Sequence, residues 1–276
     1  MLVDGGDFFA RERVEGEATS RLVWSNMEAL KYDAVTLGEG ELSQLDLLQQ
    51  LMEKTPLPVV ATNVEVLRNG VFVPLAAPYR IATLNGVRVG FLSLISENEA
   101  SPAALSTMAT EIRILPPAET AARVARELRK QADLVVLLAH VDNKTMEEYA
   151  SALPDVDMVV GGHVTIKDEG PIPIGNVVVN RSGTRGQNLC STRVIVSPLG
   201  KVVDFGGINV TLGPSFREDS TVLAQVTQVK EVENQQRQQK MKDMREKMEQ
   251  KAKERQAASE STTPAALTPP PPAQQP

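Results

Sequence analysis

The chain has 276 residues, and 42% of them are hydrophobic, enough to bury the core of one large or two small domains. Its formal net charge of −6 and its pI near 5.2 exclude a protein whose main task is to grip nucleic acid or an anionic membrane, because such surfaces are strongly basic. The single cysteine, Cys190, excludes an internal disulfide and a cysteine-based zinc cluster.

The first predicted strand, residues 1–4, starts with the chain and has no lead-in. No charged stretch followed by an apolar one is present, so no signal peptide is visible, and no apolar run is long enough to span a bilayer. If no strand preceded residues 1–4, the sheet would lack one strand, and the strands next to that gap would expose unpaired edges. We therefore expect an upstream segment that supplies a first strand. If that segment is missing from this sequence and also holds an export signal, the location would be the periplasm or the cell envelope. The sequence as it stands leaves the compartment open.

A helix over residues 15–30 and a strand over 33–37 follow, and a second helix covers 42–54. Glu39 and Glu41 lie at the turn into this second helix. The helix dipole favours acidic side chains at a helix N-terminus by about 0.3–1 kcal/mol each. This effect alone could explain why both glutamates occur there.

Residues 57–65 form the next apolar run, and we predict a strand there. Two Asn-Gly pairs follow, Asn69-Gly70 and Asn85-Gly86, each between alternating runs. Asn-Gly between strands is the strongest short signal for a β-hairpin. We therefore expect an antiparallel insert that ends in a strand over residues 87–95.

Helices are predicted over residues 116–132 and 144–153, each of them followed by an apolar run. These two runs, 133–140 and 157–163, each end at a histidine, and the chain has no other histidines. Continuous apolar runs of this length are typical of strands covered on both faces.

Further strands are predicted at 177–180, 192–195 and 202–205. Between the first two, a turn rich in small residues carries Arg181 and Arg185. The two arginines indicate either the border of an anion pocket or a plain surface loop.

The composition changes near residue 214. Residues 214–256 form a charged extension, and a helix is predicted over 221–256. The helix has a thin apolar stripe, so it either packs on a protein partner or is solvated and only weakly docked. Residues 257–276 have the composition of a disordered, proline-rich tail. The expected organisation is thus a folded domain over 1–213 followed by these two segments.

Four of the predicted strands lead into residues that commonly bind metals, namely Asp7, Glu39, His140 and His163. In open α/β sheets, ligands bind at the carboxyl ends of the strands. Two imidazoles and two carboxylates at one such edge form a ligand set for zinc, manganese or iron. The alternative for each histidine is a purely structural role.

These motifs, in this order, resemble the metallophosphoesterase domain of the bacterial 5′-nucleotidase family. The resemblance covers about residues 2–212 and rests mainly on four stretches, 4–7, 32–42, 137–140 and 157–163. It implies an α/β fold with four layers, two mixed sheets between helices, here incomplete at the N-terminus. It also implies two metal ions that activate a water molecule against a nucleotide phosphate. The family's separate C-terminal domain has no counterpart in this sequence.

The sequence departs from the family pattern at specific positions. The opening Asp-x-His motif is absent, and Glu39 stands where the family has an asparagine ligand. Gly40 stands at the position of the catalytic histidine and Ser43 at that of its supporting aspartate, so the catalytic group is unknown. Thr165 replaces the second histidine of the closing Gly-His-x-His motif. By the family's ligand scheme, one metal site is dismantled and the other kept, which predicts one ion rather than two.

Three functions follow from this comparison. The first is a metal-dependent phosphoesterase of 5′-nucleotidase type that hydrolyses a nucleotide or a related phosphate ester. The second is a catalytically inactive protein that keeps the fold and one metal site for binding. In the third, the motif residues are structural relics without a metal. The resemblance to the family favours the first function, which is the one we expect. Removal of the general acid position favours the second as chemistry, since acid–base help is worth about 10²–10⁴-fold in rate.

Overall fold

The computed structural model describes residues 1–10, 16–55, 57–96, 112–165 and 168–260. Most of the predicted proline-rich tail, from residue 261 on, lies outside these ranges. The chain divides into two compact units, Met1–Val229 and Lys230–Pro276.

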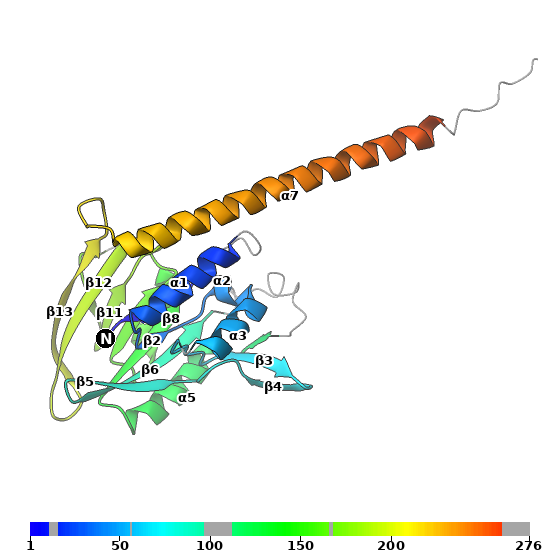
Figure 1. The fold of residues 1–276 in the computed structure, drawn as a ribbon. Helices are drawn as coiled ribbons and strands as arrows, with labels where there is room; N and C mark the ends of the chain where they lie inside the picture. The colour runs from blue at the N-terminus through cyan, green and yellow to red at the C-terminus, as the bar shows by residue number, and fades with distance from the viewer. Residues whose placement is uncertain (11–15, 56, 97–111, 166–167, 261–276) are drawn as a thin grey trace, which may run out of the picture. The chain divides into compact units, whose positions relative to one another are not determined.

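The main element of the first unit is a six-stranded mixed sheet in the order β10-β11-β9-β8-β6-β5 (Figure 1). Its strands are β5 (Arg80–Leu84), β6 (Val87–Ile95), β8 (Leu134–His140), β9 (Met158–Gly162), β10 (Ile172–Ile174) and β11 (Val177–Arg181). The four central strands run parallel to one another, and both edge strands are antiparallel to their neighbours. The carboxyl ends of β8 and β9 therefore lie side by side.

Strand β8 is buried along its whole length because both of its faces are covered. Alternate side chains of a strand point to opposite faces. Val135 and Leu137 accordingly pack beneath helices α5 (Pro117–Arg129) and α6 (Asn143–Ala152). Val136 and Leu138 pack on the other face, against a second group of strands.

This second group begins with β1 (Val3–Asp4) and β2 (Ala34–Val35), which pair in parallel. Isolated bridges then join Val35 to Val59 and Val60 to Ala77. A three-stranded sheet follows, made of β3 (Val64–Arg68), β4 (Val71–Pro74) and β7 (Ile112–Ile114). Helices α1 (Glu17–Ala29) and α3 (Leu45–Lys54) pack on the outer face of this group and bury Trp24 and Leu48.

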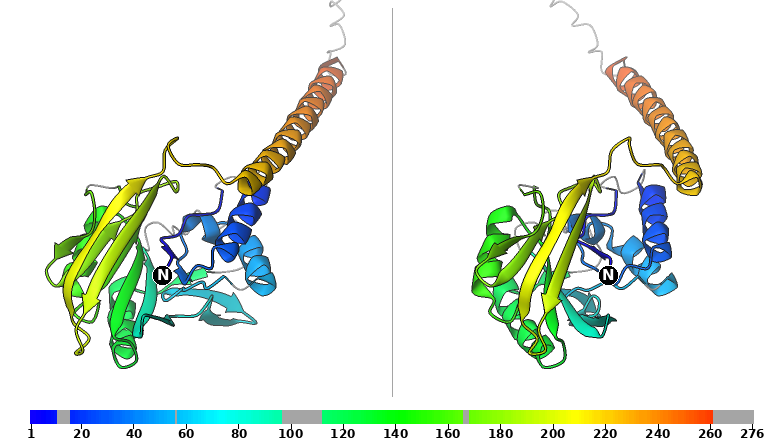
Figure 2. Two further views of the ribbon diagram at one scale, coloured as in Figure 1. Left: turned by 60° about the vertical axis from the view of Figure 1, so that its left-hand side comes forward. Right: turned by 90° about the vertical axis from the view of Figure 1, so that its left-hand side faces the viewer.

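The layers are therefore helices, six-stranded sheet, smaller strands and helices again, as Figure 2 shows in two further views. This arrangement confirms the predicted four-layer α/β fold. The six-stranded sheet is the layer that carries both histidines to one rim.

Both Asn-Gly hairpins form as predicted, with Asn69 and Asn85 in the left-handed region at φ 51° and 52°. Two other predictions in this region are wrong. Residues 57–63 hold only isolated bridges, and the strand starts at Val64. Strand β6 does not close a separate insert, because it pairs in parallel with β8 inside the six-stranded sheet.

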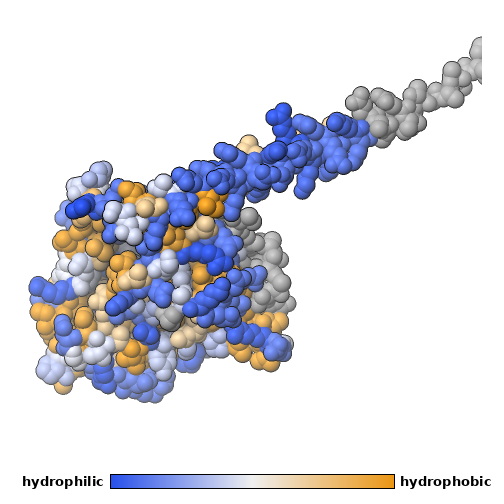
Figure 3. All heavy atoms as spheres, viewed as in Figure 1, coloured by the Kyte–Doolittle hydropathy of each residue, from blue (hydrophilic) through white to orange (hydrophobic). Residues whose placement is uncertain are grey.

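A two-stranded ribbon, β12 (Asn188–Val196) and β13 (Val202–Thr211), completes the β structure. Helix α7 (Ser220–Glu260) follows and confirms the predicted long helix. Its surface is mostly hydrophilic in Figure 3. Within the described ranges, no helix is long and apolar enough to cross a membrane.

Candidate metal centre

His140 is the last residue of β8, and its side chain is completely buried. One ring nitrogen, Nδ1, lies 2.7 Å from the carbonyl oxygen of Gly5 and donates to it when protonated. The other, Nε2, is buried and has no hydrogen-bond partner among the described residues. A histidine whose ring is held through one nitrogen while the other nitrogen makes no hydrogen bond has the arrangement typical of a metal ligand.

Asp7 lies on the loop after β1 and has a left-handed backbone, φ 64°. Its Oδ1 accepts a 2.8 Å hydrogen bond from the backbone N–H of Gly40. Its Oδ2 lies 3.6 Å from Nε2 of His140, too far for a hydrogen bond, and 4.0 Å from Nδ1 of His163.

His163 follows β9 directly and also has a left-handed backbone, φ 55°. Its ring stands edge-on to that of His140, with ring centres 5.2 Å apart. About a third of its side chain is exposed, 36%, so this ligand faces the opening of the centre.

Asp7, His140 and His163 each offer one ligand atom, and these three atoms lie within 4.8 Å of one another. The structure thus brings together three of the four predicted ligands. Glu39, the first residue of α2 (Glu39–Leu42), is not part of this group. The donor set of two imidazoles and a carboxylate, with one buried nitrogen that makes no hydrogen bond, fits a divalent cation.

Glu41, two residues further along α2, is completely buried. Its carboxylate accepts hydrogen bonds from the backbone N–H groups of Asp7, Phe9 and Gly38, at 2.9, 2.7 and 2.8 Å. It therefore fixes the loop that presents Asp7. The sequence carries a signal for this role, since a glutamate three residues after a helix N-cap can reach back to the cap's N–H.

The ionisable groups of the centre are strongly perturbed. Burial lowers the pKa of His140, but its interaction with the Asp7 carboxylate outweighs burial and raises that pKa to about 9. Burial raises the pKa of Glu41 to about 7 and that of Asp4 to about 6. Burial acts in the same direction on Asp7, but His140 and the N–H of Gly40 outweigh it, so the pKa of Asp7 is lowered.

Glycines let the backbone approach the centre closely. A Cβ at Gly38 would lie 2.3 Å from Oδ1 of Asp7 and 2.7 Å from Cε1 of His140. A Cβ at Gly162 would lie 2.0 Å from the carbonyl oxygen of Gly5. The loop after β1 thus rests directly on the backbone at the end of β9.

Gly40, Ser43 and Thr165, which depart from the family pattern, make structural contacts here. The hydroxyl of Ser43 donates to the carbonyl of Gly40 at 2.9 Å. The hydroxyl of Thr165 accepts a 2.8 Å hydrogen bond from the side-chain amide of Asn143. None of these three positions places an ionisable side chain at the centre.

Arg181 ends β11 and is only 3% exposed. Its guanidinium pairs with the carboxylates of Glu147 and Asp168, so both of its terminal nitrogens are already engaged. This placement does not support the anion-pocket interpretation for Arg181. Arg185 lies on the exposed loop that follows, in a left-handed conformation.

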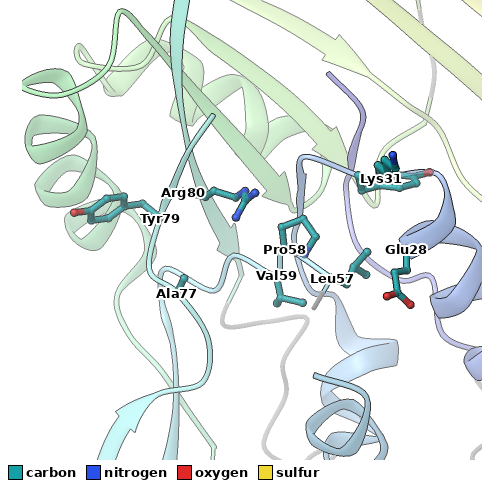
Figure 4. A pocket seen from close by; sticks show the side chains of 9 residues that line it. Glu28, Lys31, Leu57, Pro58, Val59, Ala77, Tyr79 and Arg80 are labelled. Atoms are coloured by element: carbon teal, nitrogen blue, oxygen red, sulfur yellow. The ribbon is translucent and has the colours of Figure 1, made fainter. Parts of the chain in front are cut away.

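Two surface pockets differ in their relation to the centre. One, of about 400 Å³, adjoins it and is lined by Asp142, Asn143, Lys144, Glu147, His163 and Thr165. The larger, of about 550 Å³, contains none of the predicted site residues. In Figure 4, Tyr79 and Arg80 lie on one side of this larger pocket, and Lys31 and Glu28 on the other.

No family model matches the chain. It is similar to the NAD 5′-nucleotidase of Haemophilus influenzae, with 26% identity over 138 residues, which make up 49% of this chain and 23% of that protein. It is also similar to the uncharacterized metallophosphoesterase YunD of Bacillus subtilis, with 26% identity over 167 residues, 59% of this chain and 35% of YunD.

Among solved structures, the 5′-nucleotidase precursor from Thermus thermophilus shares the fold, with a TM-score of 0.70 and 21% identity. The match covers 83% of this chain and 48% of that one. The chain therefore spans less than half the length of each of these three proteins. The sequence relatives and the shared fold together support a metallophosphoesterase domain of 5′-nucleotidase type, which the motifs of the sequence predicted.

Proposed function

We propose that this chain is a metal-dependent phosphoesterase that holds one divalent cation on Asp7, His140 and His163. The observation that carries the proposal is the buried Nε2 of His140, which makes no hydrogen bond among the described residues and lies with the ligand atoms of Asp7 and His163 within 4.8 Å. Burying a polar nitrogen without a partner costs about 1–3 kcal/mol, which a bound cation would offset. We propose one ion because these three ligands are the group that meets among the described residues.

A divalent cation held there supplies Lewis acidity, which polarises a phosphate oxygen and lowers the pKa of water. The chain's own residues do the positioning. Gly5 holds the ring of His140 through Nδ1, and the N–H of Gly40 holds the carboxylate of Asp7. His163, partly exposed, leaves the centre open towards the adjoining pocket.

The substrate class we propose is a nucleotide or a related phosphate ester. The name of the Haemophilus influenzae relative, NAD 5′-nucleotidase, supports this class. Zinc, manganese and iron are the candidate metals for this donor set of imidazole and carboxylate. A periplasmic or envelope location and a protein partner for residues 221–256 remain predictions.

Metal content and turnover test the proposal together. We expect the purified chain to hold about one equivalent of zinc, manganese or iron by mass spectrometry of the metals, and to lose it in His140→Ala and His163→Ala. Hydrolysis of adenosine monophosphate or p-nitrophenyl phosphate should vanish in Asp7→Asn. Glu53→Ala, at an exposed position of α3, is the matched control and should change neither quantity.

The alternative is a binding protein of the same fold that keeps the metal but does not turn over. The contacts of Gly40 and Ser43 favour it, because neither position supplies a general acid. Stoichiometric metal without hydrolysis would select this alternative. A chain that binds none of the three metals would contradict both functions.

A further inference from the structure

His163 differs from His140 in how its ring is held. The ring of His140 is fixed by the carbonyl of Gly5, whereas the ring of His163 has no hydrogen bond among the described residues. Its backbone is left-handed, a conformation that costs a non-glycine residue about 1–3 kcal/mol and persists only where its surroundings impose it. Beside its edge-on contact with the ring of His140 and the Asp7 carboxylate 4.0 Å away, the backbone turn is what sets the position of the His163 ring.

Contacts on both sides hold this turn. Before it, Gly161 packs so closely on helix α6 that a Cβ there would lie 2.5 Å from Sδ of Met146. After it, the side chain of Val164 is buried in the core, 1% exposed. The next residue, Thr165, accepts the 2.8 Å hydrogen bond from the amide of Asn143, at the start of the same helix.

Asn143 is not needed to cap α6. The side chain of Asp142 already accepts from the backbone N–H groups of Lys144 and Thr145, at 2.8 and 3.0 Å. The amide of Asn143 is thus directed away from its own helix and across to the turn. Asn143, His163 and Thr165 all line the same pocket of about 400 Å³ beside the centre.

We infer that Asn143 and Thr165 form a positioning pair that holds the His163 turn in its metal-binding conformation. The inference rests on the proposed function, since it assigns the pair a role at that metal site. Thr165 stands at the position of the second histidine of the family motif. In this chain that position orients a ligand instead of supplying one.

The test uses the full chain titrated by calorimetry with Zn²⁺ and, separately, with Mn²⁺. Asn143→Ala and Thr165→Val each remove the hydrogen bond, and we expect each to weaken cation affinity by about 2- to 10-fold, the range for one net hydrogen bond. The double variant should be no weaker than either single one, because both remove the same interaction. Thr165→Ser keeps the hydroxyl and should restore the wild-type affinity.

A second measurement does not depend on metal. The chain has only two histidines, so labelling histidine with ¹⁵N gives two sets of ring signals in an NMR spectrum. In Asn143→Ala we expect the signals of His163 to shift or broaden and those of His140 to stay in place.

The outcomes separate the two claims. A wild-type chain that binds neither cation would contradict the proposed function, whatever the spectra show. Wild-type affinity in both single variants would overturn the positioning pair and leave the metal site standing. Unchanged His163 signals in Asn143→Ala would also overturn the pair, whether or not a cation binds.

Discussion

At the scale of single residues, a buried carboxylate organises the centre without belonging to it. Glu41 accepts three backbone N–H groups, those of Asp7, Phe9 and Gly38. Hydrogen bonds to a charged group are worth about 1.5–3 kcal/mol each and are not additive. We expect Glu41→Ala to lower the free energy of unfolding by about 3 kcal/mol or more, measured by urea denaturation.

The exposed Glu53 provides the comparison for this change. Glu53→Ala should stay within about 0.5 kcal/mol of wild type, as surface substitutions usually do. Glu41→Gln keeps one acceptor oxygen but turns an amide N–H₂ towards donors, so its loss should be intermediate. Equal stabilities of Glu41→Ala and Glu53→Ala would contradict the role given to Glu41.

Gly38 supplies space rather than chemistry. Because a Cβ there would overlap Oδ1 of Asp7 and crowd the ring of His140, we expect Gly38→Ala to displace one ligand or the other. Cation affinity should fall at least about tenfold, the lower end for changes to groups that support metal ligands. Gly206→Ala is the matched control, because its Cβ would meet no atom within 4 Å. Similar calorimetric titrations of the two variants would refute this account.

The candidate site could be predicted from the sequence only in part. His140 and His163 each close an apolar strand, so their convergence follows from the parallel sheet. The choice between Glu39 and Glu41 does not follow, because both flank the same short helical turn. Which one points inward depends on the loop of Asp7, more than thirty residues earlier in the chain.

At the scale of the elements, β8 is the strand on which both sheet faces depend. Leu137 lies at its middle, completely buried beneath the helices. Removing a buried leucine side chain costs about 2–5 kcal/mol through lost transfer energy and the cavity left behind. We expect Leu137→Ala to lower the free energy of unfolding by this amount in urea, whereas Leu199→Ala, at a position 88% exposed, should have almost no effect. A small loss in Leu137→Ala would mean that the core around β8 collapses to fill the cavity.

Hairpins could be predicted from local sequence signals, whereas pairings between strands far apart in the chain could not. Asn85-Gly86 specifies its hairpin within four residues, and that hairpin forms. The same strand, β6, then pairs with β8, some forty residues later. Nothing near residues 87–95 encodes that partner, so the local pattern wrongly predicts an antiparallel insert.

At the scale of the whole molecule, residues 230–276 form a unit of their own. Along α7, the side chains of residues 234–254 are exposed, and local pairs such as Arg245 with Glu249 join successive turns. Exposed side chains bury little apolar surface, so a chain that ends at Val229 should unfold within about 2 °C of the full chain by circular dichroism. The same spectra should show the loss of helical signal from the removed segment. A drop of more than about 5 °C would mean that the extension stabilises the first unit.

The contact between His140 and Gly5 joins residues 135 positions apart in the chain. Ribosomes add about 5–20 residues per second, so the loop of Gly5 is made roughly 7–30 s before the strand that ends in His140. During that interval the carbonyl of Gly5 lacks the partner that it has in the folded structure. Gly162, whose backbone packs directly against Gly5, is synthesised later still. The cation centre is therefore a late product of biosynthesis, and loading has to wait until most of the first unit has left the ribosome.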